Sequence, residues 1–294
     1  MHAVRSICAA ALALSAASAQ ALTIEFDYSL DTINFFTADK RAVLDQVASI
    51  FENNLGNHLA ALSNVNVNTS GMSYYDSQTG QNVTLPGTAI TAPRQNIAAD
   101  TLRFFVAAAD LPSATLGLSY VGTSLANRVN TANNNFGSGW GGEIVFDTTM
   151  DMSMFGSGYA GQTAARRWYV DSDIRSTEAV PTNYLPTTPG GSLSNGYYVL
   201  KDQDFASVVM HEMGHAFGLQ HSSNPNDAMY AVTDGERNFF DPNDWAAMGA
   251  RGWQVLSTSP NLYTTVTMPS VPEPTAPALL LAGLAVVGVV ARRR

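Results

Sequence analysis

The side chains best suited to chemistry lie in one run of eleven residues, His211-Glu212-Met213-Gly214-His215-Ala216-Phe217-Gly218-Leu219-Gln220-His221. Residues four apart share one face of a helix, so His211 and His215 can point their rings at one metal ion. Glu212 is offset from that face and can reach a water molecule bound to the ion. Gly218 permits a sharp turn at the end of the helix, which brings His221 back as a third ligand.

Three neutral imidazoles leave one position of a tetrahedral zinc ion open for water, which is the catalytic rather than the structural pattern. Zinc lowers the pKa of such a water to about 7. Glu212 can take that proton as the water attacks a peptide carbonyl, and can then deliver it to the leaving amine. The run therefore predicts one catalytic Zn²⁺ and hydrolysis of peptide bonds, with a protein or peptide as substrate. The remaining histidine of the body, His58, is expected to be an ordinary surface residue.

The elements that must position this run can be predicted from periodicity and capping residues. The segment 204–210 begins with an acidic cap, Asp204, and continues apolar, as the start of the active-site helix would. Two further helices and four strands are expected, and two segments rich in turn formers are expected to be long loops, the second bordering the active site. The predicted helices are 38–55 and 242–250 (capped by Asp241), the strands 23–30, 64–68, 102–109 and 142–148, and the loops 130–141 and 172–196.

This pattern resembles the metzincin superfamily of zinc proteases, and within it the matrixin-like branch. Met229 lies eight residues after His221, where that branch carries its Met-turn, a hydrophobic floor beneath the metal. The resemblance implies an α+β, metzincin-like fold: a twisted mixed β-sheet with a backing helix, an active-site helix and a small C-terminal subdomain. It also implies that 142–148 is the edge strand that pairs with an extended substrate, which makes Gly142, Glu143, Ile144 and Tyr230 candidate substrate-pocket residues.

The sequence departs from the matrixin pattern in three ways. Tyr230 is followed by Ala231-Val232-Thr233 rather than by an early proline, and the histidines for a second, structural zinc are missing. The cysteine that keeps many matrixin precursors latent is also missing. Ca²⁺ is a further candidate ligand at acidic loops such as Asp171-Ser172-Asp173, on the evidence of one aspartate pair.

Two alternatives to this assignment remain at the level of sequence. In the first, the enzyme is a gluzincin and Glu236 replaces His221 as third ligand. In the second, the chain is a surface-sorted binding protein with a vestigial zinc site. Glu212 argues against the second, because a vestigial site has no need of a base.

The two ends of the chain have the composition of targeting signals. Residues 1–19 combine Arg5, a short apolar core and a small-residue cleavage site, which predicts a signal peptide removed by signal peptidase. At the other end, Val271-Pro272-Glu273-Pro274 is followed by the apolar run 276–291 and three arginines. This end resembles the PEP-CTERM sorting signal of Gram-negative bacteria, which an exosortase-type enzyme recognises. The alternatives are a buried N-terminal helix and an ordinary tail anchor.

Composition is consistent with an exported chain. The net charge is −9, and removal of both ends would take away four arginines and make it more negative, so a nucleic-acid role is not expected. The one cysteine, Cys8, lies in the leader, which excludes disulfides and thiolate ligands in the body. We expect a signal peptide at 1–19, a zinc metalloprotease domain at 20–256, a linker at 257–270 and a sorting signal at 271–294. The expected location is the cell surface or extracellular matrix, with transient anchoring of 276–291 in the inner membrane.

Overall fold

The structure is a computed structural model. It describes residues 22–76, 81–112, 115–121, 140–151, 162–175, 182–186, 197–225, 227–231 and 237–260. The chain divides into two units, Met1–Pro260 and Asn261–Arg294, and every described residue belongs to the first. The predicted signal peptide, most of the predicted linker and the sorting signal therefore lie outside the described residues.

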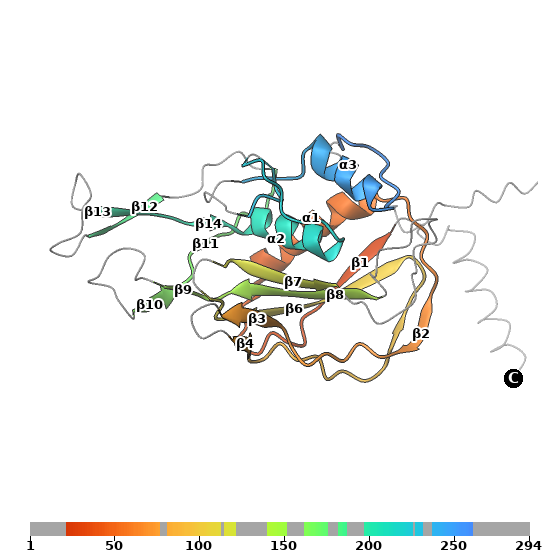
Figure 1. Ribbon diagram of the computed structural model, residues 1–294, viewed down its shortest axis with the longest axis horizontal. Coiled ribbons are helices and arrows are strands. Elements are labelled where there is room, and N and C mark those ends of the chain that lie inside the picture. The colour runs from red at the N-terminus through yellow and green to blue at the C-terminus, as the bar shows by residue number, and fades with distance from the viewer. Residues whose placement is uncertain are drawn as a thin grey trace, which may run out of the picture. The chain divides into compact units, whose positions relative to one another are not determined.

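Figure 1 shows the helices and strands of the described unit. The helices are α1 (Ala38–Asn54), α2 (Phe205–Ala216) and α3 (Pro242–Ala250). The strands of the main sheet are β1 (Thr23–Asp27), β6 (Thr101–Ala109), β7 (Gly117–Val121) and β8 (Gly141–Asp147). The remaining strands form pairs: β2 (Leu62–Val65) with β5 (Gln95–Ile97), β3 (Ser73–Asp76) with β4 (Gln81–Thr84), β9 (Thr149–Asp151) with β10 (Thr163–Ala165), β11 (Trp168–Tyr169) with β14 (Gln203–Asp204), and β12 (Thr182–Pro186) with β13 (Tyr197–Lys201).

The main sheet is mixed and has the order β1-β6-β8-β7. β1, β6 and β8 run parallel, and β7 runs antiparallel to β8. All residues of β8 and most of β6 are buried, because both strands lie in the interior of the sheet and both of their faces are covered. The expected α+β architecture of a mixed sheet with helices is confirmed.

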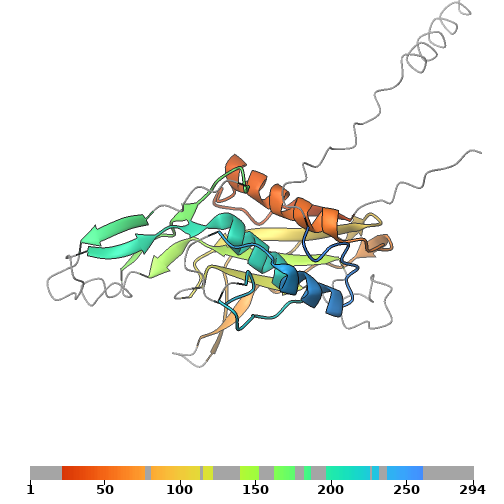
Figure 2. The ribbon, with the colours of Figure 1, turned by 90° about the horizontal axis from the view of Figure 1, so that it is seen from above.

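The three helices lie on one face of the sheet (Figures 1 and 2). α1 begins after Thr37, whose side chain accepts a hydrogen bond from the Lys40 N–H, and its apolar stripe is buried. Phe51 on this stripe stacks on Phe217, just beyond α2, with ring centroids 4.8 Å apart. Phe146 of β8 packs on Phe205 of α2 at 5.0 Å. Aromatic packing therefore fixes α2 beside α1 and against β8 of the sheet.

The segment that carries β2 to β5 covers the opposite face of the sheet. Its apolar side chains form two buried clusters with those residues of β6 and β8 that face away from the helices. One cluster holds Val65, Val67, Ile90, Ile97, Phe105 and Trp140, and the other holds Met72, Leu85, Ala107, Ala109, Leu111 and Val145. The sheet is thus the middle of three layers, and only one of its faces meets α2.

Several of the predicted elements are confirmed, with shifts at their ends. The predicted helices over 38–55, 204–210 and 242–250 are α1, the start of α2 and α3. Asp204 and Asp241 cap α2 and α3 as expected, and Pro242 is the first residue of α3. The strand predicted over 23–30 ends at Asp27, and the strand predicted over 64–68 is centred earlier, at Leu62–Val65.

The prediction that 142–148 is the edge strand is wrong. β8 lies between β6 and β7, so both of its backbone edges are already hydrogen-bonded within the sheet. The outer strand on that side is β7, for which the sequence predicts no strand. β7 has only five residues and no apolar alternation strong enough to mark it.

The predicted loop over 172–196 is also partly wrong, because it contains β12, which pairs with β13 as an antiparallel hairpin. In the other predicted loop, residues 130–139 lie outside the described part of the chain. No helix among the described residues is both long enough and apolar enough to cross a membrane. The predicted membrane segment 276–291 lies outside the residues searched.

Candidate metal centre

The helix that carries the site is fixed at its first turn by Asp204. The Asp204 carboxylate accepts hydrogen bonds from the Ser207 backbone N–H at 3.0 Å and from the Ser207 hydroxyl at 2.7 Å. The Arg237 guanidinium lies 3.0 Å from the same carboxylate, whose side chain is fully buried. The start of α2 is therefore held both by a helix cap and by a charged partner from a later segment.

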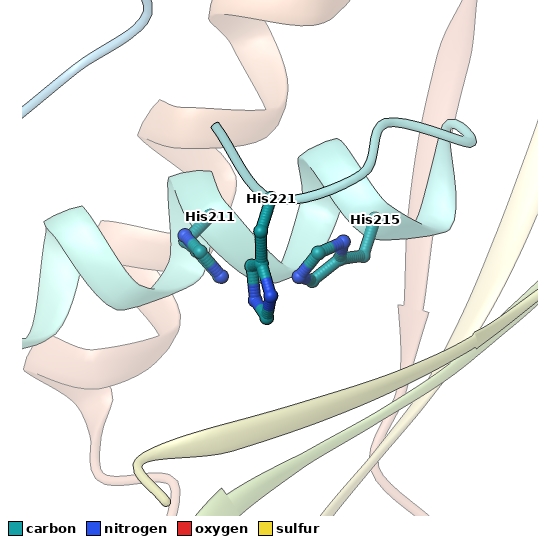
Figure 3. Close-up of side chains that lie close together, drawn as sticks. All are labelled: His211, His215 and His221. Carbon is teal, nitrogen blue, oxygen red and sulfur yellow. The ribbon is translucent and has the colours of Figure 1, made fainter. Parts of the chain in front are cut away.

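The structure brings the three predicted metal ligands together (Figure 3). The ring centroids of His211 and His215, one turn apart on α2, are separated by 4.6 Å. The centroid of His221 lies 5.3 Å from that of His211 and 4.7 Å from that of His215. One nitrogen of each ring can be chosen so that all three lie within 4.8 Å of one another. This is the one cluster of potential metal ligands found within the described segments.

A tight turn after α2 brings His221 back toward the helix. Gly218 has φ +93°, a left-handed conformation that residues with a side chain rarely adopt. The Gly218 N–H donates to the His215 carbonyl and the Leu219 N–H donates to the Gly214 carbonyl. The Leu219 carbonyl then accepts a hydrogen bond from His215 Nδ1 at 2.8 Å. The same turn thus redirects the chain and orients one of the rings.

A hydrogen bond to a backbone carbonyl determines which nitrogen of each helical histidine can bind a metal. His211 Nδ1 lies 2.7 Å from the Ala228 carbonyl, and His215 Nδ1 lies 2.8 Å from the Leu219 carbonyl. A carbonyl oxygen can only accept, so Nδ1 carries the hydrogen in both rings and Nε2 presents its lone pair. Burial lowers the pKa of His211 to about 4 and also lowers the pKa of His215. Both rings are therefore neutral at pH 7, the form that binds zinc.

Met229 lies in a turn beneath α2. The Tyr230 N–H donates to the Asp227 carbonyl and the Ser222 N–H donates to the Met229 carbonyl, which ties this turn to the residue after His221. Met229 is buried, and a Cβ built on Gly214 would approach its sulfur to 2.3 Å. Met229 therefore packs against the helix between the two histidines, and Tyr230 is half-buried directly after it.

Glu212 is buried between α2 and β7. Its Oε2 lies 2.8 Å from the Ser119 hydroxyl, which also lies 2.6 Å from the Glu212 backbone carbonyl. Burial is the main cause that raises the pKa of Glu212 to about 7, and the hydrogen bond from Ser119 opposes it. Ser119 and Gly117, which faces the same carboxylate, were not singled out from the sequence. Ser119 lies 93 residues from Glu212 and Gly117 lies farther still, and no local pattern signals such a contact.

Of the other candidate pocket residues, Glu143 is turned away from this site. Gly142, Glu143 and Ile144 are buried in the interior strand β8. Side chains alternate along a strand, and Val145 packs in the cluster on the face away from the helices. Glu143 shares that face, so its carboxylate points away from α2. Both of its oxygens are buried, burial is the main cause that raises its pKa to about 8, and a hydrogen bond from the Thr69 side chain opposes the shift.

The acidic loop considered for calcium is already neutralised by arginines. Asp173 pairs with Arg175 at 2.8 Å, and Asp171 lies 3.7 Å from Arg237. These pairs place a positive charge beside each carboxylate, and no group of metal ligands is found at this loop among the described residues. The loop gives no support to a second metal.

A family model for Matrixin matches residues 126–249, and a model for the PEP-CTERM protein-sorting motif matches residues 270–294. The chain carries a matrixin domain. The histidine cluster on and after α2 fits the zinc site of this family, so the protein is a zinc metalloendopeptidase, a hydrolase that acts on protein substrates. The sorting motif marks it as an exported protein that is sorted to the cell surface and processed by an exosortase. No curated protein matches the chain.

The matrixin match begins after β7, so β1, α1, β6 and β7 lie before it. The strands β1, β6 and β7 nevertheless complete the sheet on which α2 packs. Glu236, the third ligand in the gluzincin alternative, lies outside the described residues. In the cluster, His221 occupies the position of the third ligand, which the gluzincin alternative assigns to Glu236.

Proposed function

We propose that His211, His215 and His221 hold the catalytic zinc of this matrixin and that Glu212 is the general base. The observation that supports the ligand set best is the convergence of three ring nitrogens within 4.8 Å of one another. The hydrogen bonds from His211 and His215 to backbone carbonyls add to it, because they leave Nε2 of each ring free to bind. Zinc bound there would supply a Lewis acid that polarises the peptide carbonyl and acidifies a water.

Transfer of the proton from the attacking water is assigned to a side chain of this protein. Glu212, as the carboxylate, accepts a proton from the attacking water and later delivers it to the leaving nitrogen. Burial beside the ligands favours this role, because a carboxylate with a raised pKa is a stronger base than one in water. Met229 supports the two helical ligands from below, through its contact with Gly214 and through the Ala228 carbonyl beside it.

We further propose that the substrate chain pairs with β7 rather than with β8. β7 is the outer strand of the main sheet, it packs against α2, and it lies beside Glu212. An extended peptide added to this edge would form backbone hydrogen bonds and run past the histidine cluster. Peptides N-methylated at alternate positions test this: methylation should raise KM at every second residue, and uniform effects along the peptide would contradict the pairing.

The zinc and base assignments are tested by cleavage of casein or gelatin with the purified protein. A chelator should abolish cleavage, and Glu212→Gln should lower kcat roughly 10²- to 10⁴-fold while zinc content is retained. Glu25→Gln, the same chemical change on the surface, is the matched control. His221→Ala should lose zinc, and loss of zinc in Glu236→Ala instead would favour the gluzincin. Full activity of Glu212→Gln would overturn the assignment.

The remaining proposals concern the ends of the chain. We propose a signal peptide at 1–19, a protease domain at 20–256, a linker at 257–270 and a sorting signal at 271–294. In this scheme the run 276–291 anchors the protein transiently in the inner membrane of a Gram-negative cell, before delivery to the surface or the extracellular matrix. The arginines after that run support an orientation with the protease outside. Mass spectrometry of the surface-released protein would give both mature ends.

A further inference from the structure

We propose that Ser119 is a positioning residue for the proposed base Glu212, and that Ser119 and Gly117 together form a seat for its carboxylate on the edge strand β7. This inference rests on the proposed role of Glu212. It concerns how the carboxylate is held, which neither the zinc-binding motif nor the family match addresses. Both seat residues lie before residue 126, where the matrixin match begins.

The first observation is the bridge made by the Ser119 hydroxyl. Its oxygen lies 2.8 Å from Glu212 Oε2 and 2.6 Å from the backbone carbonyl of the same residue. A group that contacts both the main chain and the end of one side chain restricts every torsion angle between them. Glutamate has three such torsions, and a free glutamate side chain samples many combinations of them. Ser119 therefore selects one orientation of the carboxylate relative to α2.

The second observation is the bare backbone of Gly117. Residues 117 and 119 are two apart on a strand, so they share the face that meets α2. A Cβ built on Gly117 would lie 2.6 Å from Glu212 Oε1 and 2.7 Å from its Cγ, closer than atoms can approach. The carboxylate thus lies directly over this residue, and any side chain at position 117 would displace it. Serine anchors Oε2 while glycine leaves room for Oε1.

The third observation is the place of this seat in the sheet. β7 pairs with β8 on one side and is the outer strand of the sheet on the other. Ser119 and Gly117 are both half-buried, at the boundary between the sheet edge and the helix. The strand proposed to receive the substrate therefore also carries the groups that orient the base. A fixed carboxylate needs no reordering when the substrate binds, so the seat should act on kcat rather than on KM.

The test compares Ser119→Ala and Gly117→Ala in the full chain, with kcat, KM, zinc content and thermal midpoint as readouts. Loss of a hydrogen bond to a charged group should lower kcat roughly 10- to 100-fold. KM and zinc content should stay at the wild-type values. Gly117→Ala should lower kcat as well, because its methyl group displaces the carboxylate. Two variants are used so that misfolding of one leaves the other informative.

Ser49→Ala is the matched control, because its hydroxyl also donates to a backbone carbonyl, that of Gln46, but within α1. It should leave kcat unchanged. In the Glu212→Gln background, Ser119→Ala should cause no further loss, because the residue it positions is already inactive. If Ser119 had only a structural role, Ser119→Ala would instead lower the midpoint of thermal unfolding, and it would lower kcat by the same factor in the wild-type and Glu212→Gln backgrounds.

The outcomes separate this inference from the proposed function. If Glu212→Gln is inactive while Ser119→Ala and Gly117→Ala retain wild-type kcat, the seat is refuted and the base assignment stands. If Ser119→Ala lowers kcat by the same factor with and without Glu212, Ser119 acts elsewhere and the inference is again refuted. If Glu212→Gln keeps full activity, the proposed function fails and the inference fails with it.

Discussion

Replacement of Gly214 by alanine tests whether the turn that holds Met229 supports the metal centre. Gly214 lies on α2 between His211 and His215. Glycine in the middle of a helix is usually unfavourable, and alanine there should stabilise the helix by about 1 kcal/mol. On helix propensity alone, Gly214→Ala would make the protein more stable.

The packing around Gly214 reverses this expectation. A Cβ at that position would lie 2.3 Å from the Met229 sulfur and 2.8 Å from Cζ of Phe240. Both side chains are buried, and a phenyl ring cannot yield by a small rotation. Overpacking of a filled core costs about 1–3 kcal/mol. Subtracting the gain in helix propensity from this cost leaves an expected net loss of up to about 2 kcal/mol in the free energy of unfolding.

The displaced turn should also weaken metal binding. Met229 follows Ala228, whose carbonyl accepts the hydrogen bond that orients His211. When Met229 moves away from α2, that carbonyl moves with it and the ring loses its fixed orientation. Loss of such a supporting partner typically lowers metal affinity about 10- to 100-fold. Competition with a chromophoric chelator measures zinc affinity, and urea denaturation of the metal-free protein measures stability separately.

Gly249→Ala is the matched control. Gly249 lies in α3, where an added Cβ would meet only Cγ2 of Val255, at 4.0 Å. The same substitution should there stabilise the protein by up to about 1 kcal/mol and leave zinc affinity unchanged. A Gly214→Ala protein that is as stable as wild type and binds zinc equally well would refute the support ascribed to Met229.

Three further predictions concern charged groups. Burial raises the folded-state pKa of Glu143 above its unfolded value to about 8, so its stabilising contribution is present below about pH 4.5 and is lost as the pH rises to about 8. Glu143→Gln should therefore be more stable than wild type at pH 9, and an advantage that grew toward pH 5 instead would contradict this sign. The proposed base Glu212 would act as the carboxylate, and a zinc ion bound beside it would lower its raised pKa, so kcat/KM should decrease as the pH falls through about 7 or below. An acidic limb above pH 8 would exclude Glu212 as the base. Asp204→Ala removes both the α2 cap and the partner of Arg237 and should cost about 2–4 kcal/mol in urea unfolding, whereas Asp204→Asn should keep the cap and lose less.

The sequence was sufficient for features that depend on local chemistry. The helical spacing of His211 and His215, the turn at Gly218 and the caps at Asp204 and Asp241 all follow from residues within a few positions of one another. Each is a short-range rule, in which a residue type satisfies a backbone or metal requirement beside it. The structure has these features at the predicted positions.

Strand order was beyond the reach of such rules. The family resemblance predicts β8 as the edge strand, whereas β8 is strongly apolar and interior, and the outer strand β7 is short and mixed in character. Which strand lies outside depends on pairings between segments far apart in the chain, and apolar periodicity does not encode them. The error also placed Glu143 beside the substrate, although alternation along β8 turns its side chain to the opposite face. An interior strand with a buried acid has no distinguishing pattern in a single sequence.

The two halves of the active site therefore have different origins in the chain. The run from His211 to His221 carries every proposed ligand and the proposed base, and it can be recognised without the rest of the protein. The orientation of the base depends on Ser119 and Gly117, which approach it only because β7 closes the sheet beneath α2. An isolated motif with correct spacing can bind zinc, but it has no means to hold the Glu212 carboxylate in one orientation. Catalysis should therefore be more sensitive than metal binding to changes in the sheet edge, and variants of β7 that retain zinc but lose kcat would have this cause.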